Sequence, residues 1–228
     1  MLRNEIGMTE LPFQSRSQAG QLLAAELKHH KLPLNTLILA LPRGGVPVGF
    51  AIAQALRLPM DVLVARKLGV PWQHELAMGA LAGESLTLDQ ALIRDLRISR
   101  QDVDAAVIRE RAELERRERL YRGGRPAPLV RGRTVLLVDD GLATGSTMLA
   151  AARYVRSLGP ASLTIAVPVG SEQACQLVES ECNECVCLAK PRPFSAVGQW
   201  YEDFQQVSDA EVTNLLELSH RQAAHSAG

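Results

Sequence analysis

Asp139 and Asp140 are two adjacent acids that stand between an apolar run and a turn of small residues. The run, residues 135–138, is aliphatic throughout and predicts a strand that is buried on both faces. Apolar residues recur at helical spacing beyond residue 147, so the stretch is typical of a strand, a turn and a helix. Such a turn presents unpaired backbone N–H groups at the positive end of the helix dipole, where a phosphate group binds well.

The turn supplies the candidate phosphate ligands through its backbone N–H groups and its hydroxyl groups. They are Gly141, Ala143, Thr144, Gly145, Ser146 and Thr147. The two acids need a different ligand, because a phosphate repels carboxylates, whereas sugar hydroxyls and a divalent cation attract them. The pattern therefore indicates a phosphorylated sugar that is held at both ends. A Walker loop is excluded, because no lysine follows the glycine, and the stretch holds no G-x-G-x-x-G.

The sequence VLLVDDGLATGST (residues 135–147) resembles the phosphoribosyl-pyrophosphate signature of the type I phosphoribosyltransferases, with four apolar residues, two acids and a T-G-x-T turn. Further motifs, among them FQSRSQAG, LALPRGGVPVG, RKLG and YRGGRP, resemble a bacterial and archaeal group of that family. The resemblance implies an α/β fold with a doubly wound parallel sheet, a small hood and, in this chain, a helical insertion. It also implies that Asp139 and Asp140 are catalytic residues that grip the ribose hydroxyls, with Mg²⁺ as cofactor.

A second turn suited to an anion follows the buried strand predicted over residues 34–41. It has the sequence PRGG and leads into a helix predicted over residues 46–56. By the resemblance, Arg43, Gly44 and Gly45 bind the pyrophosphate. The peptide bond between Arg43 and Gly44 is the candidate for the strained cis bond that the family often has. The alternative is an ordinary turn with a solvated arginine.

Arg66 and Lys67 come directly after a further strand predicted over residues 60–65. Cations at the carboxyl end of a parallel strand point toward the ligand crevice of an open α/β sheet. By the resemblance, they are catalytic residues beside the pyrophosphate, and residues 70–75 form a mobile loop. Two solvated surface cations are the alternative. A lone loop histidine such as His74 is more often solvated than catalytic.

Residues 84–128 are predicted to form a charged helical insertion. Ser99 and Asp102 have the spacing of a capping box, and Glu113 pairs with Arg117 one turn along the helix. We interpret this helix as a solvated insertion, because its charges alternate along an exposed face. The sequence YRGGRP then ends it with helix-stop residues.

Residues 190–207, just past the last predicted strand, hold most of the few aromatic residues of the chain. The resemblance makes this segment the hood over the acceptor base, with Phe194 stacking on the ring. It also puts Asp203 near the acid that helps to hold metal and pyrophosphate in the family, although the spacing is a residue or two off. The alternative is that the aromatics only pack the hood against the core.

The bulk properties indicate an ordinary α/β domain. The chain has 228 residues, a hydrophobic content of 46% and a formal net charge of +0. The neutral charge gives no reason to expect nucleic acid or a membrane surface as a partner. We also expect no signal peptide and no transmembrane segment, and therefore a cytoplasmic location. Cys182 and Cys185 form a C-x-x-C, but without a second such pair we interpret the cysteines as buried thiols rather than a metal site or disulfide.

We therefore expect one phosphoribosyltransferase domain over residues 1–228, with a core over 15–190 and the hood over 190–207. The implied reaction transfers ribose 5-phosphate from phosphoribosyl pyrophosphate to a nitrogen acceptor, most simply a nucleobase, and releases pyrophosphate. A homodimer is the expected assembly. The alternative function is a non-catalytic regulator of the same fold that binds a phosphorylated ribose, because fold does not determine function.

Overall fold

The computed structural model describes residues 11–226, and its centre is a five-stranded sheet. The strand order is β2-β1-β6-β7-β8, and every pairing is parallel. The strands are β1 (Leu37–Ala40), β2 (Met60–Val62), β6 (Thr134–Val138), β7 (Ser162–Val169) and β8 (Glu184–Ala189). Because β1 and β6 are neighbours in register, the two turns that follow them lie side by side at the carboxyl edge of the sheet.

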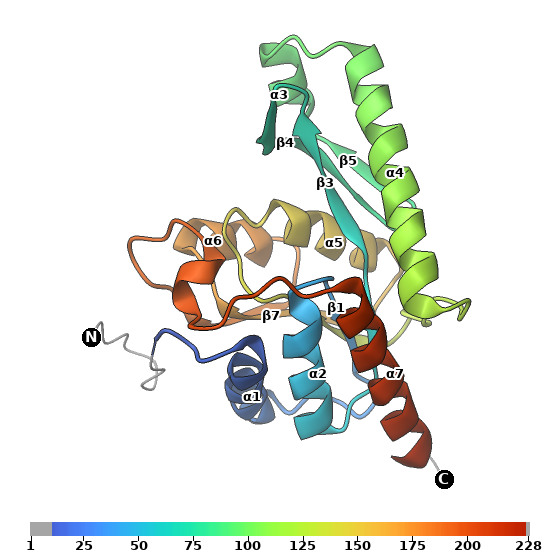
Figure 1. The fold of residues 1–228 in the computed structure, drawn as a ribbon, viewed down its shortest axis with the longest axis vertical. Coiled ribbons are helices and arrows are strands. Elements are labelled where there is room, and N and C mark those ends of the chain that lie inside the picture. Colours follow the sequence, from blue (N-terminus) through green and yellow to red (C-terminus); the bar gives the residue numbers. More distant parts are fainter. Residues whose placement is uncertain (1–10, 227–228) are drawn as a thin grey trace.

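Helices cover both faces of this sheet (Figure 1). One face carries α1 (Arg16–Leu27), α2 (Gly45–Leu56) and α7 (Asp209–Ser226), and the other carries α5 (Ser146–Ser157) and α6 (Glu172–Glu179). A short 3₁₀ turn, η1 (Lys28–His30), follows α1. Alternate residues of each strand serve the two cores: Ile38 and Leu136 pack on the α2 side, whereas Leu37 and Leu137 pack on the α5 side. The doubly wound parallel sheet predicted from the sequence is confirmed.

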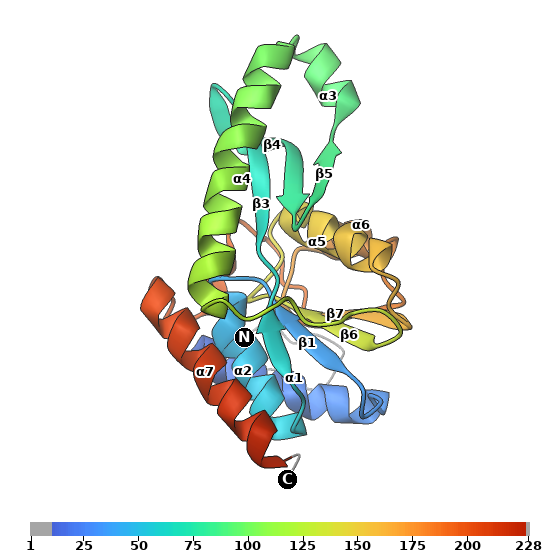
Figure 2. The same ribbon diagram turned by 90° about the vertical axis from the view of Figure 1, so that its right-hand side faces the viewer.

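A second, antiparallel sheet rises from the core as an arm (Figures 1 and 2). It contains β3 (Ala65–Val70), β4 (Gln73–Ala82) and β5 (Ser85–Leu88), and it packs against α3 (Gln90–Asp95) and α4 (Arg100–Arg122). We call these elements, residues 65–122, the arm. The strand predicted over 60–65 is present as β2, but its predicted end is wrong, because β2 ends at Val62 and a new strand begins at Ala65.

The next strand, β4, does not join the parallel sheet. It pairs with β3 in a hairpin whose register runs from Ala65 opposite Ala82 to Val70 opposite Gln73. A short turn between two runs of this length favours antiparallel pairing, since a parallel return needs a crossover of a dozen residues or more. The predicted mobile loop over 70–75 is the end of this hairpin, so the insertion begins about twenty residues earlier than its predicted start at residue 84.

The arm is anchored at its base by two side chains of α4. Tyr121 is 0% exposed, and its hydroxyl donates to Asp209 Oδ1 of α7 at 2.6 Å. Arg122 donates to the carbonyl oxygen of Val62 at 3.0 Å and lies 3.6 Å from Asp61. The YRGGRP segment is therefore the point at which the arm joins the core, and Gly123, with φ of 56°, ends α4 there.

The helix start predicted at Ser99 agrees with the structure, and two further serines cap helices in the same way. Ser15, Ser99 and Ser208 each accept a hydrogen bond from the backbone N–H three residues later. After β8 the chain forms the 3₁₀ turn η2 (Val197–Trp200), and Phe13 bridges to Tyr201 beside it. No helix of the described residues is long and apolar enough to cross a membrane.

Candidate active site

The two acids lie where β6 meets the turn after β1. Asp139 and Asp140 follow the last residue of β6, and Leu41, just after β1, donates its backbone N–H to the carbonyl oxygen of Val138 at 2.8 Å. Asp139 Oδ1 accepts the backbone N–H of Asp140 at 2.8 Å, which orients the first carboxylate. The parallel register thus brings the acid pair and the PRGG turn together, as the sequence predicted.

Two positions of the PRGG turn must be glycine, because the turn lies directly against the acid pair and the end of β6. A Cβ on Gly44 would lie 1.9 Å from Asp140 Oδ2, and a Cβ on Gly45 would lie 2.7 Å from the carbonyl oxygen of Val138. Any side chain there would displace the acid pair or the end of β6. The two turns are therefore in direct backbone contact, and Gly44 and Gly45 make that contact possible.

The PRGG turn contains a cis peptide bond between Pro42 and Arg43. The sequence-based prediction placed this bond between Arg43 and Gly44, one residue too late, because the motif shows where the turn lies but not which bond is inverted. Arg43 itself lies 3.9 Å from Asp209 Oδ1, so its guanidinium points toward the start of α7 and the base of α4.

Arg16 is a site residue that sequence reasoning did not single out. Its Nε donates to Asp140 Oδ2 at 2.7 Å, its Nη1 donates to the carbonyl oxygen of Gln205 at 2.8 Å, and its guanidinium lies 3.8 Å from the ring centre of Phe204. Only 11% of the Arg16 side chain is exposed. Tyr201 also donates its hydroxyl to the backbone oxygen of Asp140 at 2.6 Å. One arginine at a helix start gives no sign of this in the sequence, because its partners are more than 120 residues away.

The acid pair is destabilised in its charged form. Burial, followed by the neighbouring charge of Asp140, raises the pKa of Asp139 well above its ordinary value. Burial also raises the pKa of Asp140, and the hydrogen bond from Arg16 opposes that shift. Two carboxylates in this setting favour a ligand that brings hydroxyl donors or a cation.

The turn over residues 141–147 leads into α5 through Gly145, whose φ of 77° is left-handed. The first backbone hydrogen bond of the helix runs from Leu149 to Gly145, and the N–H groups of the first turn have no partner within a helix. Ser171 Oγ donates to the carbonyl oxygen of Ala143 at 2.8 Å and ties the turn to the start of α6. The hydroxyl groups of Thr144 and Ser146 lie 3.4 Å apart. This geometry suits a phosphate dianion.

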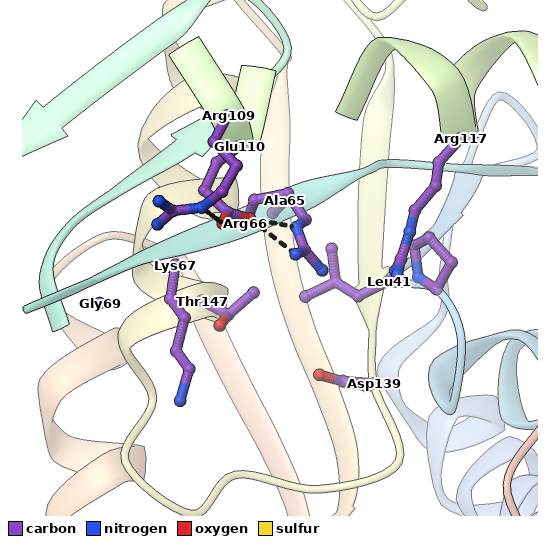
Figure 3. Close-up of a pocket in the computed structure, with 11 residues that line it drawn as sticks. Leu41, Ala65, Arg66, Lys67, Gly69, Arg109, Glu110, Arg117, Asp139 and Thr147 are labelled. Carbon is purple, nitrogen blue, oxygen red and sulfur yellow. Dashed lines mark hydrogen bonds and ion pairs between the residues drawn. The ribbon is translucent and has the colours of Figure 1, made fainter. Parts of the chain in front are cut away.

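A cavity of 440 Å³ lies between the carboxyl edge of the parallel sheet and the arm (Figure 3). Its lining comes from both sides and consists of Leu41, Pro42, Ala65, Arg66, Lys67, Gly69, Arg109, Glu110, Arg117, Asp139 and Thr147. In Figure 3 Asp139 stands between Thr147 and Lys67 on one side and Leu41 and Arg117 on the other. The cavity therefore joins Asp139, the first residue of the acid pair, with the start of α5 and the RKLG segment in one site.

The arm forms a cationic wall of this cavity. Arg66 Nη2 and Nε donate to Glu110 Oε2 at 2.6 and 2.9 Å, and Arg109 Nε lies 3.2 Å from the other oxygen of the same carboxylate. Arg117 reaches the cavity from the next turns of α4. The interpretation of this helix as a solvated insertion is wrong for this face. Its i, i+4 charge pairs gave no sign of the inward side chains, because β3 supplies the opposing surface.

Phe194 and Asp203 are not among the described residues that line the cavity. The ring of Phe194 lies 6.0 Å from that of Trp200 within the hood. Asp203 is exposed, and its Oδ1 accepts the backbone N–H of Gln205 at 3.2 Å. Among the residues described, no three acid, histidine or cysteine side chains are grouped to hold a metal ion, and the four cysteines are free thiols.

Known proteins resemble this chain over most of its length. The model of the "Phosphoribosyl transferase domain" family matches residues 18–202. Two Mycobacterium tuberculosis proteins, named "Putative phosphoribosyl transferase MT0597" and "Putative phosphoribosyl transferase Rv0571c", are each 40% identical over 215 residues. The alignment includes 94% of this chain and 48% of each relative, so the chain spans about half the length of these curated relatives.

A solved structure shows the same fold with a clear sequence relation. The crystal structure of TT1426 from Thermus thermophilus matches with a TM-score of 0.78 and 38% identity, over 90% of this chain and 98% of that one. The family suggested by VLLVDDGLATGST is thus confirmed by a family model, by relatives and by a structure. This chain belongs to the phosphoribosyl transferase domain family.

Proposed function

We propose that this chain transfers the 5-phosphoribosyl group from phosphoribosyl pyrophosphate to a nitrogen acceptor, most simply a nucleobase, and releases pyrophosphate. One observation carries the proposal: a single cavity holds Asp139 between the start of the phosphate-turn helix and the cationic wall of the arm. A phosphorylated sugar with a polyanionic leaving group is the ligand that needs all three features.

Each feature has a role in binding the donor. The 5′-phosphate binds the backbone N–H groups and hydroxyls of residues 141–147 at the start of α5. The ribose hydroxyls bind Asp139 and Asp140, and hydroxyl donors relieve the cost of burying these carboxylates. Arg43, Gly44 and Gly45 meet the pyrophosphate from the sheet edge, and Arg66 and Lys67 meet it from the arm.

The reaction breaks the bond between the anomeric carbon and the pyrophosphate oxygen, a nitrogen of the acceptor forms the new bond, and the proton that this nitrogen carried passes to the solvent or to the released pyrophosphate. The leaving group departs with the bonding electron pair, so the ribose ring passes through an oxocarbenium-like state. The carboxylates of Asp139 and Asp140 stabilise the positive charge on the ring, and the cations of the arm wall stabilise the negative charge on the leaving group. These charges act only when the donor is oriented between them.

Mg²⁺ is the proposed cofactor. Within the described residues the donor set has too few grouped ligands for an all-protein metal cage. It does fit the usual coordination of this ion, which binds through one or two carboxylates together with phosphate oxygens of the substrate. Asp139 and Asp140 would hold it beside the ribose and pyrophosphate oxygens. When bound, it supplies positive charge that neutralises the leaving group.

The hood is the proposed acceptor side. Phe194, beside Trp200, offers an aromatic surface on which a nucleobase can stack. Arg16 and Tyr201 connect this segment to Asp140, so acceptor binding and the position of the acid pair are linked. Asp203 is exposed beside this connection and is the weaker candidate for a metal contact.

Titration calorimetry with phosphoribosyl pyrophosphate and Mg²⁺ tests the proposal, on the wild type and on the double variant Asp139→Asn/Asp140→Asn. We expect Mg²⁺-dependent micromolar binding by the wild type and its loss in the variant. Pyrophosphate release is then assayed with a panel of purine and pyrimidine bases. Donor binding without turnover by any base would favour the non-catalytic regulator, and no donor binding by the wild type would refute the transferase function.

A further inference from the structure

Arg117 of α4 enters the cavity from the side opposite the PRGG turn. It lines the cavity together with Leu41 and with Pro42, the first residue of that turn, and only 17% of its side chain is exposed. Figure 3 shows its side chain running from α4 toward Leu41. An arginine this far buried at a cavity wall loses hydration, so it needs acceptors there.

Arg117 has one strong protein partner, and that partner orients it. Its Nε donates to Glu113 Oε1 at 2.7 Å. Glu113 also accepts two hydrogen bonds from Arg116, and these, followed by Arg117, lower its pKa to about 2. The carboxylate therefore stays charged at any physiological pH and holds the guanidinium in place. The bond to Glu113 uses the Nε donor, and a guanidinium has four more on its two other nitrogens.

A second glutamate of α4, closer to the start of the helix, is also shared between two arginines of the arm wall. Glu110 is 13% exposed and holds both Arg66 and Arg109. Glu110 and Glu113 are thus each shared between two arginines, so the wall keeps more positive than negative charge. Counted over the cavity lining, four cations (Arg66, Lys67, Arg109 and Arg117) face two acids (Glu110 and Asp139). The cavity is therefore suited to a ligand group with several negative charges.

We propose that Arg117 binds the pyrophosphate of the donor from the arm side, opposite the PRGG turn, with Arg109 as the outer cation of the same wall. The inference rests on the proposed function, of which it is a refinement. It assigns to the helical insertion a part of the leaving-group site, held by a rigid helix rather than by a loop. In Figure 3 Arg117 and Thr147, at the start of α5, lie on different sides of Asp139, and we therefore assign Arg117 to the pyrophosphate rather than to the 5′-phosphate.

Arg117→Gln tests the assignment, with Arg119→Gln as the matched control. Arg119 lies on the same helix with 72% of its side chain exposed and pairs only distantly with Glu115, at 3.7 Å. Dissociation constants are measured for phosphoribosyl pyrophosphate, inorganic pyrophosphate and ribose 5-phosphate, all with Mg²⁺. We expect Arg117→Gln to weaken the first two by roughly 10- to 100-fold, as for a lost charge-assisted hydrogen bond, and ribose 5-phosphate by less than about twofold.

Arg117→Lys keeps the charge and should recover part of the lost affinity. This second variant also tests the assignment if the glutamine variant folds poorly. Equal weakening of pyrophosphate and ribose 5-phosphate would mean a purely structural role and overturn the inference, as would unchanged pyrophosphate affinity. Titration of pyrophosphate alone separates the two proposals. Its binding and Arg117 dependence can persist in a protein that turns over no donor, in which case the transferase function fails and this site stands.

Discussion

The two walls of the cavity present different groups to a ligand, one mainly backbone and the other mainly long side chains. The sheet wall, formed by the turns after β1 and β6, brings backbone to the ligand: two glycines in direct contact with the acid turn, and the start of a helix. The arm wall, formed by β3 and α4, brings long charged side chains. A backbone wall has little freedom to adapt, whereas a wall of arginines can adjust each contact by rotamer changes.

The pKa values of the acids on the two walls are also shifted in opposite directions. Burial raises the pKa of Asp139 and Asp140, so the sheet wall holds an acid pair that is costly to ionise without a ligand. Arginine hydrogen bonds lower the pKa of Glu113, and the Tyr121 hydroxyl leads the causes that lower that of Asp209. These acids, on and beside the arm, are stabilised by the protein itself. The difference indicates that the carboxylates of the sheet wall depend on a ligand to offset the cost of their charge, whereas the carboxylates of the arm wall are already paired with donors of the protein.

The largest effect is expected from Gly44→Ala. The new Cβ would overlap Asp140 Oδ2, so the acid pair must move away from the turn and from Arg16. We expect a loss of roughly 100-fold or more in turnover, as for a misplacement of about 1 Å, and a destabilisation of about 1–3 kcal/mol. Pyrophosphate release and urea unfolding are the measurements.

Gly132→Ala is the control for this variant. Gly132 has φ of 72° and open space around it, so the alanine costs roughly 1–2 kcal/mol of backbone strain and leaves the site intact. If both alanine variants lose stability but keep their activity, the sheet wall is more adaptable than its geometry indicates.

Arg16→Gln should have the next largest effect. It removes the cation beside Asp140 and the contact with Phe204, in a pair whose side chains are 11% and 14% exposed. We expect the free energy of unfolding to fall by about 2–3 kcal/mol and the melting temperature to fall by roughly 4–10 °C. Differential scanning calorimetry measures it. Arg16→Lys keeps the charge and should recover part of the loss; a glutamine variant as stable as the wild type would show that the buried pair contributes nothing.

Asp139→Asn should stabilise the ligand-free protein at neutral pH while it abolishes donor binding. The raised pKa of Asp139 means that the fold favours its protonated form, so its contribution to stability is present below the ordinary pKa of an aspartate and is lost as the pH rises through the raised value. A neutral amide avoids that loss and keeps the Oδ1 acceptor for the N–H of Asp140. Melting curves at pH 7 should place the variant above the wild type, and the reverse order would contradict the sign argued here.

The smallest effect that we expect is a loss of stabilisation by Glu113 of the arm at acid pH. Glu113 has its pKa lowered from 4.5 to about 2, so its contribution to stability is complete above pH 4.5 and is lost as the pH falls from 4.5 toward 2. In Glu113→Gln this contribution is absent at every pH. We therefore expect the difference in unfolding free energy between wild type and variant to shrink over that range, measured by urea titration at several pH values. Glu115→Gln, on the exposed side of α4, is the control for the loss of a carboxylate from this helix.

The chain sequence was most informative where local pattern and chemistry coincide. The apolar run, acid pair and T-G-x-T turn predicted a strand, a turn and a helix, and β6 and α5 have that arrangement. The serine cap at residue 99 marked the start of the insertion helix correctly. The predicted roles of Thr144 or Phe194 in ligand binding stay predictions, because they depend on a ligand.

The arm was the main failure of sequence reasoning. RKLG was expected at the end of a parallel strand, but Arg66 and Lys67 lie within β3 of an antiparallel sheet. Short strands of moderate hydrophobicity do not reveal which sheet they join. Helix α4 showed its exposed charge pairs clearly, while the inward position of Arg109 and Arg117 depends on where β3 packs against the helix.

By itself the sequence determined the two strand, turn and helix segments that begin with β1 and β6, the order of the motifs along the chain and the family, because each rests on residues that are close in sequence. Only the tertiary structure decided that Arg16 holds Asp140 across more than 120 residues, that the cis bond falls between Pro42 and Arg43, and that an insertion helix forms one wall of the cavity. Contacts between distant segments depend on how the sheet, the arm and the hood pack against one another. The pattern of neighbouring residues in the sequence does not predict that packing.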